Sequence, residues 1–293
     1  MSSTSYIDVR DVVKVYETAT GGVTALRGVS FTVDKGELAV VMGPSGSGKT
    51  TLLSIIGGLD RPSAGEVYVD GQPIHKMTSR QLDEFRRRNI GFVFQFLNLI
   101  PKLTAYENIY IPMVARGVKD GRKRVEYIAD ALGIANKLDR LVEELSGGEQ
   151  QRVAIAAAVA ADPPIIIADE PTAELDGETI ERIMDFFMEL KSGGKTIIIA
   201  THDPRVSRKS DKIIVLEDGL VRGVYRGGEL TTSEVAVKGY RDYLRRRLME
   251  IDDELRLLGE RYKRGELSID EFHKRYNRLR EIKAFLEDEL KFG

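Results

Sequence analysis

A glycine-rich stretch carries the strongest chemical signal in the chain. Residues 43–50, Gly-Pro-Ser-Gly-Ser-Gly-Lys-Thr, fit the pattern G-x-x-x-x-G-K-[ST] directly after the apolar run Leu38–Met42. Glycines let backbone N–H groups close around phosphate oxygens, and we expect Lys49 to reach the β- and γ-phosphates of a nucleotide. The Thr50 hydroxyl, at the start of a predicted helix, is suited to bind Mg²⁺. The strand before this phosphate loop and the helix after it disfavour the alternative, an ordinary glycine-rich turn.

Two adjacent carboxylates end a second apolar run. Ile165–Ala168 is followed by Asp169 and Glu170, and burying such a pair costs free energy unless a cation or a substrate lies beside it. Asp169 is suited to hold Mg²⁺ through water, and Glu170 to polarise an attacking water as a general base. The alternative, an N-cap for the next helix, is weakened by Pro171 and by the phosphate loop upstream. The pair therefore indicates two distinct chemical roles.

Hydrophobic patterning predicts the elements that position these residues. Alternation over Tyr6–Val15 and Ala25–Val33 predicts two antiparallel strands, separated by a turn at Thr20-Gly21-Gly22. Short apolar runs that end in polar residues predict buried parallel strands over Leu38–Met42, Gly91–Phe94, Ile165–Ala168 and Thr196–Ala200. The pattern is that of an α/β fold with its polar residues at the ends of parallel strands.

Helical patterns occupy two further stretches. Residues 103–161 are predicted to be mostly helical. After Gly227-Gly228 charged residues become dense, and apolar residues recur in a heptad seam of Leu244, Leu248, Ile251, Leu255, Leu258 and Tyr262. A break at Gly265 and a capping-box pair, Ser268 and Glu271, predict a second helix. Because acidic and basic residues are mixed, the pattern favours a solvated helical hairpin over a membrane-binding helix.

Composition narrows the classes of function. The chain has 293 residues, enough for one large domain and an addition, and its net charge is −2, without the basic excess usual in nucleic-acid binders. The absence of cysteine excludes disulfides, thiolate metal sites and cysteine nucleophiles. No apolar run approaches the roughly 18 residues that span a bilayer. The N-terminus lacks the pattern of a signal peptide, so we expect a cytoplasmic protein.

A family resemblance rests on a third motif. Residues 145–152, Leu-Ser-Gly-Gly-Glu-Gln-Gln-Arg, resemble the signature of the ATP-binding-cassette (ABC) ATPases. Four further motifs resemble the same family in order and spacing across about residues 6–225: the A-loop at Tyr16, the Q-loop at Phe94-Gln95, the D-loop at Glu174-Leu175-Asp176 and the switch loop at Thr201-His202-Asp203.

The resemblance implies the domain organisation. It implies an α/β P-loop NTPase core of RecA-like type, with an antiparallel β subdomain and a helical signature subdomain. The ABC ATPase domain is then residues 1–230, with the helical subdomain at about 96–160. Residues 231–293 form a C-terminal helical hairpin extension, which either adds dimer contacts or regulates access to a partner, or packs on its own subunit.

The resemblance also implies the site residues and cofactors, which are ATP and Mg²⁺. Within one subunit ATP would be bound by Tyr16, Ser45, Gly46, Ser47, Gly48, Lys49, Thr50, Thr51, Gln95, Asp169 and His202. The catalytic residues would be Glu170, His202 and Lys49. The ligands of Mg²⁺ would be Thr50, Gln95 and, through water, Asp169. Two copies would pack head to tail, so that each serves the ATP of the other through Ser146, Gly147, Gly148, Glu149 and Asp176.

Three residues depart from the family pattern. Glu149 stands where many members have Gln, and we expect little loss from this change. Ala157 stands where the family usually has Arg, so an ion pair that anchors the signature helix is expected to be missing. Glu174 replaces a small D-loop residue, and its charge is expected to weaken association without ATP.

The branch of the family is indicated by segments around the Q-loop. Residues 57–62, 92–101 and 104–109 resemble the lipoprotein-release, macrolide-efflux and cell-division type of ABC ATPase. Such a chain would hydrolyse ATP and drive a separate membrane permease, from the inner face of the membrane.

Other classes of function compete with this interpretation. An amino-acid importer has a similar cassette, and soluble ABC ATPases act on nucleic acid. The latter need coiled-coil insertions, zinc-binding cysteines or two cassettes in one chain, none of which this sequence has. A non-hydrolysing ATP sensor is expected to lack Glu170 or His202, and both are here. We therefore expect transport coupling, with no nucleic-acid partner.

Overall fold

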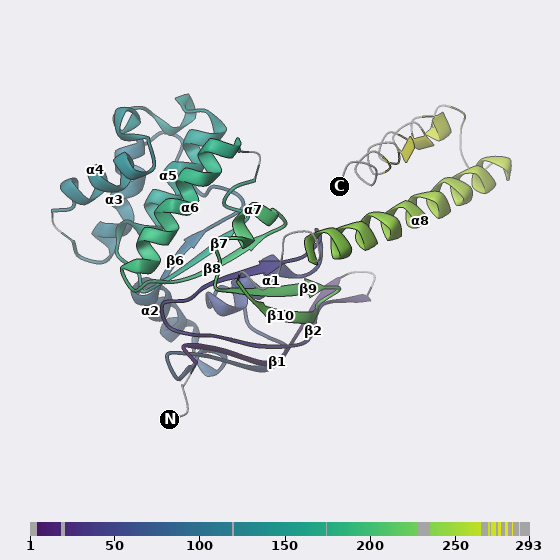
Figure 1. Ribbon diagram of the computed structural model, residues 1–293, viewed down its shortest axis with the longest axis horizontal. Coiled ribbons are helices and arrows are strands. Elements are labelled where there is room, and N and C mark those ends of the chain that lie inside the picture. Colours follow the sequence, from purple (N-terminus) through teal and green to yellow (C-terminus); the bar gives the residue numbers. More distant parts are fainter. Residues whose placement is uncertain are drawn as a thin grey trace. The chain divides into compact units, whose positions relative to one another are not determined.

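A computed structural model describes residues 5–18, 21–118, 120–173, 175–227 and 235–264, and scattered positions between 269 and 287. The chain divides into two compact units, Met1–Glu229 and Leu230–Gly293, and Figure 1 shows the elements of each. The division falls one residue before the boundary between residues 230 and 231 that the resemblance implies. Glu174 and Ser268, two residues of interest in the sequence, lie outside the described residues.

The larger sheet of the first unit is almost entirely parallel. Its strand order is β10-β9-β3-β8-β7-β6, and β10 alone runs antiparallel to its neighbour. The strands are β3 (Leu38–Met42), β6 (Ile90–Val93), β7 (Ile165–Asp169), β8 (Thr196–Thr201), β9 (Lys212–Glu217) and β10 (Leu220–Arg226). Every residue of β3, β7 and β8 is buried, as expected for strands covered on both faces. The four predicted parallel strands are confirmed to within one residue at each end.

The second sheet is antiparallel, in the order β2-β1-β4-β5. Its strands are β1 (Ile7–Thr18), β2 (Gly21–Val33), β4 (Ala64–Val69) and β5 (Gln72–Pro73). The predicted turn at residues 20–22 is wrong, because Gly21 and Gly22 belong to β2 and pair with Thr18 and Glu17. Side-chain alternation ends where the strands leave the core, whereas their backbone hydrogen bonds continue beyond it.

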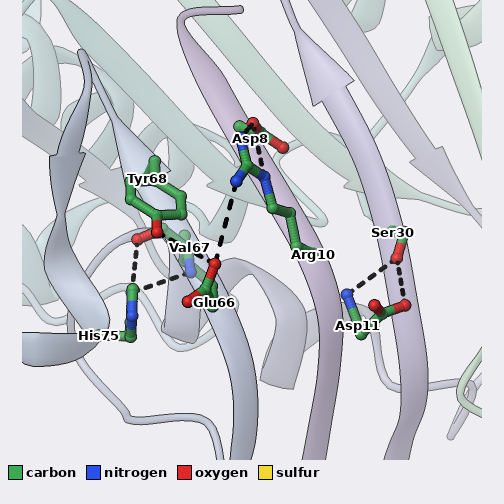
Figure 2. A network of polar contacts seen from close by, with 8 residues as sticks. All are labelled: Asp8, Arg10, Asp11, Ser30, Glu66, Val67, Tyr68 and His75. Carbon is green, nitrogen blue, oxygen red and sulfur yellow. Dashed lines mark hydrogen bonds and ion pairs between the residues drawn. The ribbon is translucent and has the colours of Figure 1, made fainter.

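A polar network joins β1, β2 and β4 on this sheet (Figure 2). Arg10 binds Asp8 Oδ2 at 2.6 Å and lies 3.9 Å from Glu66 Oε2, and the Asp11 N–H donates to Ser30 Oγ at 2.8 Å. Asp11 has φ +47° at a break in the strand register. The network therefore fixes an irregular stretch of β1 across both of its neighbours.

Helix α1 (Lys49–Ile56) lies between the two sheets. It contacts β7 and β8 of the parallel sheet and β1, β2 and β4 of the antiparallel sheet. Its apolar residues, Leu52, Leu53, Ile55 and Ile56, belong to the core that both sheets share. The phosphate loop therefore leads from a buried strand into a buried helix, and both hold its ends in place.

A group of helices occupies the middle of the chain, as predicted for residues 103–161. It comprises α3 (Ala105–Ala115), α4 (Arg122–Ala131) and α5 (Gly147–Ala160), with the 3₁₀ turns η2 (Ala135–Lys137) and η3 (Val142–Glu144). Figure 1 shows α3, α4 and α5 gathered on one side of the first unit, and α3 and α4 pack on α5. The remaining helices of this unit are η1 (Ile74–Lys76), α2 (Ser79–Asn89), α6 (Gly177–Ser192) and α7 (Pro204–Ser207).

The second unit begins its described part with α8 (Val235–Lys263). Of the predicted seam, Ile251 and Leu258 are buried. The described positions after residue 264 are helical, and two contacts join them to α8: the rings of Tyr262 and Phe272 stack at 4.5 Å, and Lys283 Nζ lies 2.6 Å from Asp252 Oδ1. These contacts are those of a helical hairpin. Within the described residues, no helix combines the length and the apolar character needed to cross a membrane.

Candidate functional site

The phosphate loop is shaped by glycines at two points of close contact. Gly46 and Gly48 have φ of +79° and +100°, in the left-handed region. A Cβ on Gly48 would lie 2.6 Å from the Ala25 carbonyl oxygen, and one on Gly43 would lie 2.0 Å from the Leu216 carbonyl oxygen. Any larger residue at Gly43 or Gly48 would displace β9 or β2. The loop is therefore set by the strands on both sides of it.

Lys49 is a nearly buried cation at the start of α1. Its Nζ donates to the carbonyls of Gly43 at 2.8 Å and Pro44 at 3.0 Å, and lies 3.6 Å from Glu170 Oε1. Burial lowers the pKa of Lys49, and the carboxylates of Glu170 and Asp169 act against this shift. Such a cation at a helix N-terminus is suited to bind an anion.

Asp169 and Glu170 lie at the carboxyl end of β7. Asp169 is 2% exposed, and its Oδ1 and Glu170 Oε2 are buried without a hydrogen-bond partner. Burial raises the pKa of Asp169, which the Thr50 hydroxyl and Lys49 oppose. The capping alternative fails for both residues, because α6 begins only at Gly177 and Asp176 is its N-cap. Two buried oxygens without partners indicate that a ligand completes this site.

His202 closes the site at the end of β8. Its Nδ1 lies 3.1 Å from Glu170 Oε1, and this hydrogen bond raises the pKa of His202. Burial alone would raise the pKa of Glu170, but the hydrogen bond and charge of His202, together with Lys49, lower it. Glu170 is therefore held as a carboxylate between two basic side chains. Its φ of +49° is a strained conformation for a residue with a Cβ.

A divalent cation fits beside Asp169, although few protein ligands are present. In the described part of the chain, no three His, Asp or Glu side chains converge as a metal site. The Thr50 hydroxyl and the unpartnered Asp169 Oδ1 supply oxygen ligands, which Mg²⁺ accepts while keeping water and phosphate oxygens. Gln95 is exposed just after β6, which lies next to β7 in the sheet. The donor set fits Mg²⁺ bound together with a nucleotide.

Tyr16 lies near the start of α1 and is 39% exposed. Its hydroxyl donates to Asp60 Oδ2 at 2.9 Å and approaches Thr51 Oγ1 at 3.4 Å. Lys14 Nζ lies 4.8 Å from the Tyr16 ring centroid and 2.7 Å from Asp60 Oδ1. Sequence reasoning missed Lys14 and Asp60, whose only signal was the resemblance around residue 60. Together they hold the ring in a fixed orientation.

The signature residues begin α5. Ser146 Oγ accepts from the Glu149 N–H at 3.4 Å, while Glu149 Oε2 accepts from the Ser146 N–H at 2.9 Å and from its hydroxyl at 3.0 Å. Lys137 Nζ lies 3.0 Å from Glu149 Oε1. The Ser146 backbone and then Lys137 lower the pKa of Glu149 to about 2. Lys137 is a further residue that sequence reasoning missed, because nothing in its surroundings suggested a role.

The structure groups the predicted residues into two sets. Lys49, Asp169, Glu170 and His202 form one contiguous cluster. The signature instead adjoins the D-loop, since a Cβ on Gly148 would lie 3.2 Å from Leu175 Cδ2. Asp176 accepts from the Thr179 N–H at 2.9 Å and so caps α6. Among the hydrogen bonds and ion pairs identified for the described residues, none joins the signature residues to the cluster around Lys49.

At Ala157, where we expected an ion pair that anchors the signature helix to be missing, other arginines hold that helix. Ala157 is half-buried within α5, at the position where the ABC ATPases usually have an arginine. The Ala160 carbonyl, at the end of α5, accepts a hydrogen bond from Arg124 Nε at 2.6 Å. The next carbonyl, that of Ala161, accepts one from Arg116 Nη1 at 2.7 Å. The helix is therefore anchored through its C-terminus by two arginines from α4 and from the end of α3.

The phosphate loop follows the central strand β3 of the larger sheet, and the two carboxylates follow β7, the next strand but one; this arrangement is that of a P-loop NTPase fold. The model of the ABC transporter family matches residues 26–173. An uncharacterized ABC transporter ATP-binding protein of Thermotoga maritima is 45% identical over 224 residues, which are 76% of this chain and 96% of that protein. The lipoprotein-releasing system ATP-binding protein LolD of Aquifex aeolicus is 42% identical, over 74% of this chain and 94% of that protein.

Solved structures agree with these relatives. The dimeric post-hydrolysis structure of the ATP-binding cassette MJ0796 bound to ADP and Pi has a TM-score of 0.71 and 42% identity. The match covers 76% of this chain and 100% of that structure. The chain belongs to the ABC transporter family, and it is an ATP-binding and ATP-hydrolysing subunit of that family. The predicted family, fold class and ATPase activity are confirmed.

Proposed function

We propose that this chain is the ATPase subunit of an exporter-type or lipoprotein-releasing transporter, and that two copies of it close head to tail around two ATP molecules. The observation that carries the catalytic part is Glu170, which lies between Lys49 and His202 with one carboxylate oxygen free of protein partners. A carboxylate so placed is suited to orient and deprotonate a water. The dimeric state rests on the cassette structures that are similar to this chain.

In this proposal each residue of one subunit has a distinct task. The backbone N–H groups of residues 45–51 surround the phosphates, and Lys49 neutralises their charge. The Tyr16 ring stacks on the adenine. His202 holds Glu170 and contacts the γ-phosphate. Mg²⁺, held by Thr50, Gln95 and, through water, Asp169, would offset charge on the leaving phosphate.

The residues of the signature act on the other subunit's ATP. Gly147 and Gly148 are the first residues of α5, so their N–H groups lie at a helix N-terminus without intrahelical acceptors. Such a terminus is suited to bind an anion, and in the proposed head-to-tail dimer it would lie over the opposite phosphate loop. Leu175, next to Asp176 in the chain, adjoins Gly148, and we propose that Asp176 also serves the other subunit's ATP.

The Glu170→Gln variant tests the catalytic assignment. We expect the rate of ATP hydrolysis to fall at least about 100-fold, because the amide cannot accept a proton, while ATP stays bound and a closed dimer accumulates. Steady-state phosphate release and size-exclusion chromatography with ATP measure the two effects. The exposed Glu178 provides a matched control, Glu178→Gln, which should behave as wild type. Turnover close to wild type in Glu170→Gln would overturn the role given to Glu170.

The permease is proposed to dock on the helical segment between residues 96 and 160. Large apolar side chains are exposed there: Phe96 is 82% exposed, Val114 54% and Ile100 47%. Apolar surface of this kind is typical of a protein interface. Docking would place the chain on the inner face of the membrane, as a peripheral subunit.

Affinity capture from gently solubilised native membranes tests the transporter branch. A multi-span permease with a large extracytoplasmic domain is the expected partner, and Phe96→Ser should reduce its recovery while ATP hydrolysis by the free chain persists. A permease recovered with a solute-binding protein would indicate an importer instead. Recovery of nucleic-acid-associated partners alone would contradict transport coupling.

A further inference from the structure

An acidic side chain lies where the proposed function requires a phosphate to bind. Glu149 is the third residue of α5, in the signature that is to contact the other subunit's γ-phosphate. A carboxylate beside a phosphate is repulsive, and this repulsion is strong where solvent is excluded. The inference that follows rests on the proposed head-to-tail dimer. It concerns how this chain accommodates the extra negative charge.

The carboxylate of Glu149 is fully engaged. Its Oε2 accepts from both the N–H and the hydroxyl of Ser146, and its Oε1 lies 3.0 Å from Lys137 Nζ. The Glu149 side chain is 19% exposed and that of Lys137 is 35% exposed. Both oxygens are therefore held by partners on two different elements, Ser146 at the N-cap of α5 and Lys137 in the turn η2 (Ala135–Lys137).

Lys137 is itself fixed by the backbone of η2. Its N–H donates to the Ile134 carbonyl at 2.9 Å, and its carbonyl accepts from the Arg140 N–H at 3.0 Å. The backbone of Lys137 is therefore held in place, and its side chain reaches Glu149 from this turn. Together, the Lys137 ammonium and the Glu149 carboxylate carry no net charge next to the signature.

We propose that Lys137 is a positioning residue for ATP bound in trans: its ammonium holds Glu149 against the Ser146 cap and cancels the carboxylate charge that would otherwise repel the approaching γ-phosphate. Lys137 does not touch ATP in this account. Its effect is exerted through Glu149, and it is felt only when two subunits close.

A double-mutant cycle on ATP-dependent dimerisation tests this proposal. The dimer constant of Glu170→Gln chains is measured by sedimentation velocity in ATP for four versions: otherwise unchanged, Lys137→Met, Glu149→Gln, and both together. We expect Lys137→Met to weaken the dimer about fivefold when Glu149 is present and to have no effect when residue 149 is Gln. Lys137→Arg should restore dimerisation, and the defect of Lys137→Met should shrink as salt is raised from 50 to 500 mM, concentrations at which charge repulsion is progressively screened.

A matched control is the ion pair of Lys102 with Glu143, whose atoms lie 2.8 Å apart in the same helical group. Lys102→Met removes the same charge from a more exposed position and should leave the dimer constant unchanged. Thermal unfolding of each variant shows whether it is folded. An equal effect of Lys137→Met in both backgrounds would overturn the proposal, because the lysine would then act independently of Glu149.

The proposed function is checked separately with Ser146→Arg, which blocks the signature. Loss of the ATP-dependent dimer in Ser146→Arg, with no effect of Lys137→Met, would leave the head-to-tail dimer in place and refute the role of Lys137. Retention of the dimer in Ser146→Arg would instead refute the signature contact itself, and the role of Lys137 with it.

Discussion

At the residue scale, the site is organised around Glu170. Its carboxylate is held 3.1 Å from His202 Nδ1 and 3.6 Å from Lys49 Nζ, at the end of a buried strand and in a strained backbone conformation. Strain of this kind persists only where surrounding structure imposes it. Here β7 pairs with β6 up to Ala168 and with β8 up to Asp169, and the Glu170 N–H donates to the Ala200 carbonyl at 2.9 Å.

The pair of His202 and Glu170 predicts a pH dependence of stability. Because the pKa of His202 is raised in the folded chain, its contribution is fully present below about pH 6.5 and declines as pH rises through the folded-state pKa. The pKa of Glu170 is lowered, so its contribution is present above about pH 4.5 and declines as pH falls. Lys49 and Asp203 are the other charges that act on His202.

Urea unfolding of wild type and His202→Gln between pH 5.5 and 8.5 measures this effect. The stability difference between the two should be largest near pH 6 and smaller at pH 8.5. In the Glu170→Gln background, the His202→Gln change should show a much weaker dependence on pH. A difference that grows towards pH 8.5 would contradict the pairing.

At the element scale, the phosphate loop depends on close packing against strands on either side. Gly43→Ala would place a Cβ 2.0 Å from the Leu216 carbonyl oxygen on β9, and because this neighbour is backbone, rotation of a side chain cannot relieve the clash. We expect the free energy of unfolding to fall by about 2–4 kcal/mol, as for other severe backbone clashes. Urea unfolding at constant pH provides the measurement.

Gly71→Ala is the matched control for this variant. Gly71 has φ +72°, but nothing lies within 4 Å of its added Cβ, so only conformational strain of about 1 kcal/mol is expected. Equal losses for Gly43→Ala and Gly71→Ala would show that β9 does not confine the loop.

The elements that sequence could predict are those determined locally. The apolar runs that predicted β3, β7 and β8 are local patterns, and the three strands are present. The phosphate-loop spacing is also a local pattern, and it lies between β3 and α1 as predicted. Contacts between distant residues left no such pattern: Lys14 reaches Asp60 across 46 positions, and Lys137 pairs with Glu149 from another element. The ends of β1 and β2 that face each other were predicted too short, because their backbone hydrogen bonds continue beyond the last buried residues. The assignment of individual site residues stays a prediction that the experiments above test.

At the scale of the whole molecule, the chain divides into two units, each compact in itself. The core shared by the two sheets and α1 contains residues from Tyr6 to Leu216, and Ile251 and Leu258 are buried in the second unit's helix. A chain ending at Gly227 should therefore fold, hydrolyse ATP and unfold within about 1 kcal/mol of the same free energy as the first unit of the full chain.

Light scattering of the same truncation, with and without ATP, tests the role proposed for the hairpin. We propose that the hairpin adds dimer contacts or regulates access to the permease. Weaker dimerisation of the truncated chain would support the dimer contact, and unchanged dimerisation in both conditions would remove it. Loss of folding on truncation would contradict the expectation that the first unit folds on its own.

The central claim is that each ATP site is built from two subunits, and mixing two inactive variants tests it most directly. Lys49→Ala disables the phosphate loop, and Ser146→Arg disables the signature. In a head-to-tail mixed dimer, one of the two sites combines an intact loop with an intact signature. We predict that equal mixing restores between about a quarter and a half of wild-type ATP turnover, because each mixed dimer has one intact site of two and mixed dimers make up from half to all of the dimers. Turnover no greater than that of the separate variants would contradict the account.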